Sequence, residues 1–259
     1  MGRRQRRDPG RPDPRGRRSD ARQAARGISE RARRRGGRAC AAGRRQAEVV
    51  AAGDVTPPRT RIALVDPRRP EAPVLEEAAA VLRGGGLVAF PTETFYGLGA
   101  PALDRAAVRR VFELKGRPET KPLLVLVDSL AMAERVGVFG PAARALAARH
   151  WPGALTLVVA AGAHVPEEVT AGTGTIGVRV SPHPVARGLV EALGAPVTAP
   201  SANASGGRPP TTAADVLAYF RDRIELVLDG GPTRGGEPST VLDTTVEPPR
   251  VVRQGAVRP

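Results

Sequence analysis

Residues 84–128 limit the folds that this chain can adopt more than any other stretch does. Three glycines lead into the apolar run LVAF at 87–90, which Pro91 follows. A short apolar run with these borders is typical of a buried strand, and Pro91 ends it because proline brings no ladder donor. The polar loop PTETFYG precedes apolar residues at helical spacing between 103 and 114. A basic loop and the apolar run 123–127 follow, so the predicted order is strand, loop, helix, loop, strand.

The same alternation continues through the rest of the chain. Further apolar runs predict strands at 61–65, 155–160, 175–180, 196–199, 224–228, 239–243 and 251–253. Helical spacing predicts helices at 75–83, 130–136, 141–150, 184–193 and from a cap at Thr211 or Thr212 to 220. This order predicts an α/β fold with a single twisted mixed sheet and helices on both faces. Short connections near 229–231 and 248–249 predict some antiparallel pairing, and ligands in such sheets commonly bind outside the strand ends.

Positive charge is concentrated at the start of the chain. The net charge is +14, but residues 1–61 hold nineteen arginines against six acidic residues, which leaves the remainder nearly neutral. Residues 1–60 also hold almost no large apolar side chains, so they cannot offset the entropy cost of ordering. We therefore predict a disordered tail at 1–60 and one catalytic domain at 61–259.

Three interpretations of this tail remain open: an RNA-binding arm, an organelle-targeting sequence, or translated sequence upstream of the true start. Arginine-rich arms bind phosphate backbones without sequence preference. This tail has no aromatic residue for base stacking and has acids scattered through it. These features favour a tail without function, with weak RNA binding as the alternative.

Several classes of protein are disfavoured by what the sequence lacks. A single cysteine, Cys40, excludes an intramolecular disulfide and a Cys-rich metal site, and no histidine has metal-like spacing. No apolar stretch approaches the ~18–20 residues of a membrane span, and no signal-peptide core follows the arginines. Neither a P-loop nor a dinucleotide-binding motif is present. We expect a cytoplasmic protein with no membrane contact and no metal site built from protein side chains.

Three basic positions stand out against this background. Lys115 and Lys121 are the only lysines among forty Lys and Arg residues, which suggests sites that need a compact, mobile ammonium. A solvated basic turn is the alternative. Arg179 lies in an otherwise apolar or small run, and because an unpaired buried arginine is costly, it should face a carboxylate or an anionic ligand. His183 is expected to have a structural role at a helix start rather than to act as a general base.

Seven segments, taken in order, resemble the YrdC-like threonylcarbamoyl-adenylate synthases. They are PTETFYGLG, KGRPETKPL, WPGALTLVV, TIGVRVSPHP, APSANASG, STVLD and VVRQGAV, and the resemblance covers about residues 72–256. It implies one twisted α/β domain with a deep, positively lined cavity, in a short form without the extra C-terminal domain of longer members. It also implies a nucleotidyltransferase that joins L-threonine, bicarbonate and ATP and releases pyrophosphate. The product would pass to a tRNA threonylcarbamoyl-transferase for the modification of adenosine 37 in tRNAs that read ANN codons.

The resemblance also assigns site residues, motif by motif. Arg117 and Lys121 match triphosphate contacts, with Lys115 beside them, and Lys115 and Arg117 are the expected catalytic residues. The remaining ATP-binding positions are Thr175, Ser201, Asn203, Pro209 and Arg253. The threonine-binding positions are Thr94, Arg179, Ala199 and Ser239, and Arg179 would take the carboxylate. Mg²⁺ is expected with ATP, without assigned protein ligands.

Two positions depart from the family pattern. Lys121 stands where many relatives have Asn, and Leu126 stands where many have His. Because a leucine side chain cannot form a hydrogen bond, only packing or a backbone contact remains at position 126.

The implied chemistry brings a triphosphate together with carboxyl-type anions, so cations must stabilise charge at the α-phosphate. The threonine amine attacks CO2 or bicarbonate and the carbamate oxygen attacks phosphorus, so positioning and electrostatics suffice without a protein nucleophile. Two other classes compete with this enzyme. One is a nucleic-acid-binding module, suggested by the tail, and the other is a carbamoyl-transfer or hydrolytic domain on the same fold.

Deleting residues 1–58 should leave adenylate formation and the melting temperature unchanged, because the segment has no core-forming pattern and lies before every motif. Turnover and thermal unfolding of the truncated and full-length proteins measure this. A large loss of either quantity in the truncated protein would contradict it.

Overall fold

The computed structural model describes residues 59–259, so the predicted tail lies outside the described residues except for its last two positions. The strands are β1 (Arg61–Leu64), β2 (Val88–Pro91), β3 (Tyr96–Gly99), β4 (Leu124–Leu126), β5 (Gly137–Val138), β6 (Leu155–Ala161), β7 (Thr175–Arg179), β8 (Val197–Thr198), β9 (Leu226–Asp229), β10 (Thr240–Asp243) and β11 (Arg250–Arg253). The helices are α1 (Ala72–Arg83), α2 (Arg105–Lys115), α3 (Leu130–Val136), α4 (Pro141–His150), α5 (Glu167–Thr170), α6 (Pro184–Leu193) and α7 (Ala213–Phe220). Within this part of the chain, no helix is long and apolar enough to cross a membrane.

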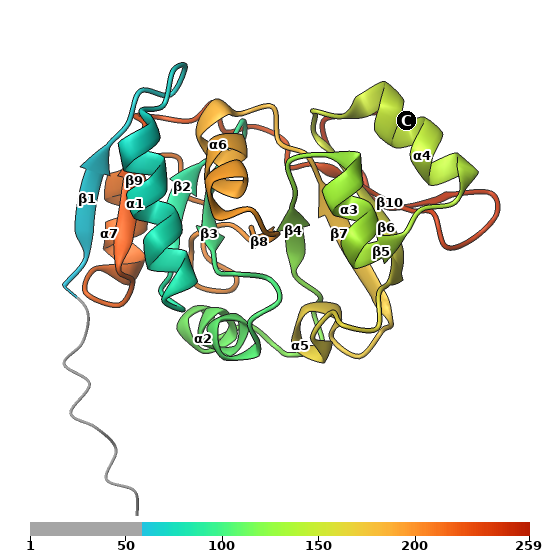
Figure 1. Cartoon of the computed structure of the whole chain (residues 1–259), viewed down its shortest axis with the longest axis horizontal. Coiled ribbons are helices and arrows are strands. Elements are labelled where there is room, and N and C mark those ends of the chain that lie inside the picture. The colour runs from blue at the N-terminus through green and yellow to red at the C-terminus, as the bar shows by residue number, and fades with distance from the viewer. Residues whose placement is uncertain (1–58) are drawn as a thin grey trace, which may run out of the picture. The chain divides into compact units, whose positions relative to one another are not determined.

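The strands form two mixed sheets that lie side by side (Figure 1). The smaller has the order β1-β9-β2-β3, and the larger has the order β11-β10-β6-β7-β4-β8, with β5 added on β6. β9 pairs in parallel with both β1 and β2, whereas β2–β3, β6–β7 and β10–β11 pair antiparallel. The α/β class with mixed strand directions is therefore confirmed, and β1 lies at an edge as a four-residue strand. The predicted single sheet is instead two sheets, because β3 and the β8 segment meet through isolated bridges rather than a continuous ladder.

Backbone hydrogen bonds join the two sheets where β3 meets the segment that continues β8. Leu98 N donates to Pro200 O at 2.8 Å, and Thr198 N donates to Ala100 O at 2.9 Å. The Thr198 hydroxyl adds two more bonds, since it accepts from Ala100 N at 2.9 Å and donates to Leu98 O at 3.1 Å. The strands thus continue from one sheet to the other across this junction.

Helix ends follow the residues that the sequence offers for capping. Asp104 accepts from the first amides of α2, and Thr212 forms a capping box with Asp215 at α7. α1 and α6 pack on each other over β2, and the face of α1 made of Leu75, Ala78, Ala79 and Leu82 is buried. Gly116, at φ 56°, ends α2 in the left-handed conformation and turns the chain into the basic loop.

Two local predictions were wrong, and short elements were missed. The segment PTETFYG is not one loop, because Pro91 pairs with Tyr96 and residues 96–99 form β3 of a hairpin. The turn at 229–231 produces no antiparallel pair, because β9 lies between β1 and β2 and is parallel to both. The short helix α5 was not predicted. The connection at 248–249 does join antiparallel strands.

Thr198→Val should destabilise the protein by about 1–3 kcal/mol, because it keeps the side-chain shape but leaves buried backbone groups of Leu98 and Ala100 without a partner. Urea unfolding measures the change. Thr120→Val, at an exposed loop position, is the matched control and should stay within about 0.5 kcal/mol. Equal stability of the two variants would show that the hydroxyl does not support the junction.

Candidate active site

A cavity of about 770 Å³ lies over the junction of the two sheets. Its floor is one face of the larger sheet, because side chains on a strand alternate between faces and every second residue points into the cavity. The floor residues are Thr156 and Val158 of β6, Thr175, Gly177 and Arg179 of β7, and Ser239, Val241 and Asp243 at β10. The expectation that ligands bind beyond the strand ends is therefore only partly met.

Loops from both sheets build the walls of this cavity. The β2–β3 hairpin supplies Thr92, Thr94 and Phe95, and the loop after α2 supplies Arg117. Nine of the twelve predicted site residues line the cavity: Thr94, Arg117, Thr175, Arg179, Ala199, Ser201, Pro209, Ser239 and Arg253. Lys115, Lys121 and Asn203 do not.

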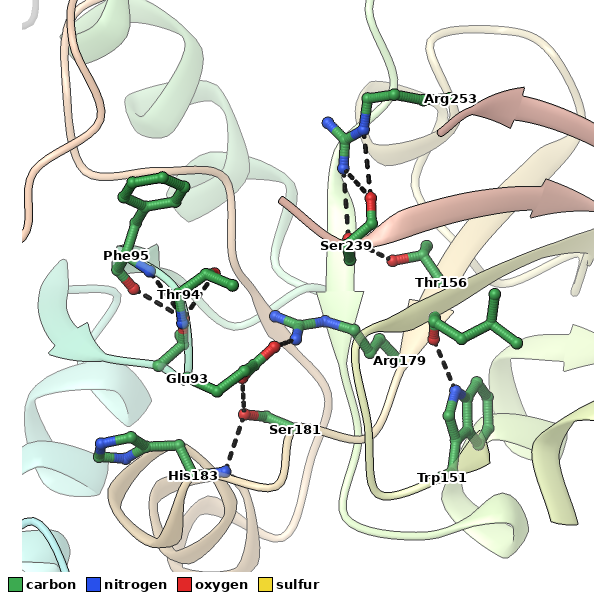
Figure 2. Close-up of polar contacts among 12 residues, drawn as sticks. Glu93, Thr94, Phe95, Trp151, Thr156, Arg179, Ser181, His183, Ser239 and Arg253 are labelled. Atoms are coloured by element: carbon green, nitrogen blue, oxygen red, sulfur yellow. Dashed lines mark hydrogen bonds and ion pairs between the residues drawn. The ribbon is translucent and has the colours of Figure 1, made fainter. Parts of the chain in front are cut away.

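Arg179 is buried and paired with a carboxylate, as its apolar neighbours in sequence led us to expect. Its guanidinium forms an ion pair with Glu93 of the β2–β3 hairpin (Figure 2). Ser181 Oγ donates to Glu93 Oε2 at 2.6 Å and accepts from His183 N at 3.2 Å. Burial, and then the nearby Arg253, lowers the pKa of Arg179 to about 10, so it remains charged at neutral pH.

His183 has the structural role that was predicted. Its Nδ1 accepts the backbone N–H of Val185 at 3.3 Å and so caps α6. Burial lowers the pKa of the imidazole, which favours the neutral form that can accept this bond.

Arg253 reaches the cavity from β11 and is anchored at Ser239 (Figure 2). Its Nη2 donates to Ser239 O at 2.8 Å and lies 3.2 Å from Ser239 Oγ. That hydroxyl also shares a hydrogen bond of 2.9 Å with Thr156 Oγ1 on the floor. These hydrogen bonds link Arg253 to Ser239 and Ser239 to Thr156. They fix a second guanidinium and two hydroxyl groups on the side of the cavity formed by β6 and β10.

Arg117 supplies the third cation. Its Nε donates to Lys121 O at 3.1 Å and its Nη2 donates to Pro122 O at 2.8 Å. These bonds use one edge of the guanidinium to fold the basic loop and leave Nη1 for a ligand. Burial lowers the pKa of Arg117, although an arginine stays charged at neutral pH.

Lys115 lies beneath the cavity wall rather than in it. Its side chain is buried, and Nζ donates to Ser201 O at 2.5 Å and to Asn203 O at 2.6 Å. Burial, and then Arg117, lowers its pKa to about 8. Lys115 therefore holds the backbone of the 201–203 loop. The sequence suggested a site that needs a compact ammonium, and the structure shows that this ammonium binds carbonyl oxygens of the protein.

The other predicted positions also support loops or face solvent. Asn203 Nδ2 donates to Ala204 O and Gly207 O at 2.7 and 2.9 Å, and its buried Oδ1 has no hydrogen-bond partner among the described residues. Lys121 is exposed, and Leu126 is buried in the core rather than in the cavity lining.

Sequence reasoning missed Glu93 as the partner of Arg179 and Thr156 as the partner of Ser239. Each pair joins residues more than 80 positions apart, so no local pattern could reveal it. A signal for the floor did exist, because Thr175, Gly177 and Arg179 alternate with Ile176 and Val178 at the period of a strand.

Fold and cavity together define an α/β domain with an arginine-lined cavity. The Sua5/YciO/YrdC family model, described as telomere recombination, matches residues 80–255. The chain belongs to this family, which confirms the resemblance found in its motifs.

Two relatives and one solved structure give the extent of the similarity. Threonylcarbamoyl-AMP synthase of Pyrococcus abyssi is 48% identical over 181 residues, which cover 70% of this chain and 53% of that protein. The protein of the same name from Thiobacillus denitrificans is 41% identical, with 63% and 87% covered. The crystal structure of P. abyssi Sua5 complexed with L-threonine has a TM-score of 0.73 at 46% identity and covers 75% of this chain and 57% of that chain. The chain spans about half the length of the P. abyssi and Bacillus subtilis proteins.

Lysine-selective ¹³C labelling should give two side-chain signals, of which the one from Lys115 titrates near pH 8. The Lys121→Arg variant assigns it by removing the other signal. The ordinary pKa of a lysine side chain is 10.5, so between about pH 8 and 10.5 Lys115 binds more protons in the unfolded chain than in the folded protein. Lys115 therefore makes the free energy of unfolding rise with pH in that window. A Lys115 signal that titrates at or above 10.5 would contradict its buried environment.

Proposed function

We propose that this chain is an L-threonylcarbamoyladenylate synthase, a nucleotidyltransferase that condenses L-threonine, bicarbonate and ATP into threonylcarbamoyl-AMP and pyrophosphate. The observation that carries the proposal is the cavity lining, in which Arg117, Arg179 and Arg253 meet from distant parts of the sequence. Several cations in one cavity suit a reaction that brings a triphosphate and a carboxylate together. The names of the P. abyssi and T. denitrificans relatives point to the same reaction.

In this proposal different residues of the cavity lining contact different substrates. Arg117 and Arg253 would contact ATP, together with Thr175, Ser201 and Pro209. Lys121 and Asn203, which were also expected to contact ATP, do not line the cavity, and Asn203 would act by supporting its own loop. Arg179 would take the threonine carboxylate, with Thr94, Ala199 and Ser239 around the rest of the amino acid. Lys115 would act through the loop whose carbonyls it holds, which keeps Ser201 in place.

The chemical steps need orientation more than a reactive side chain. The threonine amine attacks CO2 or bicarbonate, which gives a carbamate, and water leaves when bicarbonate is the donor. A carbamate oxygen then attacks the α-phosphorus of ATP, and pyrophosphate leaves. The free Nη1 of Arg117 would stabilise negative charge that develops on the phosphates, because a fixed charged donor is stronger in a partly buried site than in water.

We further propose that Mg²⁺ enters with ATP. Mg²⁺ usually keeps several waters and is bound through one or two carboxylates plus substrate phosphates. Asp243 is the acidic residue in the described lining, and Thr245 and Arg250 already contact its oxygens. Of the described residues, no group of three or more His, Cys, Asp or Glu side chains could hold a metal ion. This donor set fits an ion carried mainly by the triphosphate.

The biological setting is also a proposal. The product would pass to a tRNA threonylcarbamoyl-transferase for the modification of adenosine 37, and the enzyme would work in the cytoplasm. The arginine-rich tail could add weak, sequence-independent binding of RNA.

Pyrophosphate release tests the function directly. Full-length protein should release pyrophosphate when ATP, threonine and bicarbonate are all present, and omission of any one should abolish it. L-Valine should replace threonine poorly, because a site that pairs a substrate hydroxyl strongly rejects an analogue without it. Release without threonine would instead favour a carbamoyl-transfer or hydrolytic activity, and no release would favour a nucleic-acid-binding module.

Arg117→Ala should reduce the efficiency with ATP by about one to two decades, because a charge-assisted hydrogen bond contributes about 1.5–3 kcal/mol. Arg117→Lys should restore only part of it, since lysine lacks the planar fork that holds Lys121 O and Pro122 O. Arg149→Ala, at an exposed position of α4, is the control. Wild-type ATP affinity and pyrophosphate release in a folded Arg117→Ala protein would remove this loop from the active site.

A further inference from the structure

Arg179 is already paired with a carboxylate of the protein, that of Glu93, before any ligand binds. Glu93 pairs with its Nη1, and the two side chains are only 18% and 5% exposed. The Glu93 carboxylate cannot swing away freely, because its Oε2 accepts from Ser181 at the entry to α6 and its backbone lies in the β2–β3 hairpin. A negative charge is therefore fixed beside the cation that faces the cavity (Figure 2).

The remaining nitrogens of Arg179 decide where a ligand can bind. Nε is buried and has no hydrogen-bond partner among the described residues, and Nη1 is buried against Glu93. Arg179 nevertheless lines the cavity, which leaves Nη2 as the nitrogen that can face a ligand. A ligand carboxylate on Nη2 would share one guanidinium with Glu93, so two carboxylates would lie on adjacent nitrogens.

We propose that Glu93 is a specificity-determining residue that restricts the Arg179 subsite to zwitterionic amino acids and rejects simple carboxylates. A ligand that carries only a carboxylate is attracted by Arg179 but repelled by Glu93, and it has no positive charge of its own for Glu93 to attract. An α-amino acid carries an ammonium next to its carboxylate, so the attraction of Glu93 for the ammonium offsets that repulsion. This inference rests on the proposed function, in which Arg179 takes the carboxylate of the amino acid.

The other charged groups around the subsite do not supply this selection. Arg253 is a second cation and would favour any anion. The Asp243 carboxylate already accepts hydrogen bonds from Thr245, in the loop after β10, and from Arg250 on β11. Among the described residues, Glu93 is the carboxylate paired with Arg179, so its charge should set the preference for a zwitterion.

Binding of two ligands by isothermal titration calorimetry tests the proposal. The probes are L-threonine and (R)-3-hydroxybutanoate, which keeps the carboxylate, the hydroxyl and the methyl group but lacks the ammonium. The wild-type protein should bind threonine at least about tenfold more tightly than the analogue. In Glu93→Gln the ratio of the two affinities should fall to about threefold or less, because the amide has no charge to repel a carboxylate or to attract an ammonium.

A ratio of affinities separates selection from a structural effect, since a loosened cavity would weaken both ligands alike. Glu93→Asp keeps the charge and should keep the discrimination. Glu225→Gln removes the partner of Arg110 in an ion pair outside the cavity lining, and should leave the ratio at its wild-type value. If Glu93→Gln does not fold, the wild-type ratio still decides, because equal affinities for the two probes would overturn the proposal.

The possible failures are distinguishable. A wild-type protein that does not bind threonine would contradict the proposed function and would remove the basis of this inference with it. Threonine binding with an unchanged ratio in Glu93→Gln would overturn the role of Glu93 alone and leave the proposed function standing.

Discussion

The candidate active site depends on the backbone hydrogen bonds that join β3 to the segment after β8. Without them the two sheets would be separate, and the hairpin carrying Thr94 and Glu93 would not face Arg179 on β7. The bonds cross a junction that contains buried polar groups, so every amide and carbonyl there needs a partner. The Thr198 hydroxyl alone pairs with two of these groups, the amide of Ala100 and the carbonyl of Leu98. A polar side chain in the core therefore stabilises the junction.

A second buried polar group stabilises the other wall. Lys115 places an ammonium under the 201–203 loop and donates to the carbonyls of Ser201 and Asn203. Placing a lysine there is costly in desolvation, and its lowered pKa reflects this. Ala202 is buried in the core and the Asn203 amide donates to Ala204 O and Gly207 O, so the ammonium is one of several contacts that fix the conformation of this loop.

The sequence alone predicts elements whose signals are local. The helix at 141–150 was predicted with its observed bounds, and the cap of α7 was predicted at Thr211 or Thr212, of which the structure has Thr212. The need of Arg179 for an anionic partner was also recognised. β3 was missed because Gly97 and Gly99 carry no side chain to show alternation. The identity of the Arg179 partner and the inward direction of Lys115 depend on contacts across about 86 positions of sequence, which local patterns do not encode.

The alternation along β7 has a consequence for how this protein can vary. Ile176 and Val178 are buried in the core, while Thr175, Gly177 and Arg179 face the cavity, so one register serves both. Inserting or deleting a single residue in this strand would exchange the two sets, putting a guanidinium into the hydrocarbon interior and a valine where a ligand binds. Changes of length are therefore confined to the connecting loops, and new ligand preferences must arise by substitution at alternate positions.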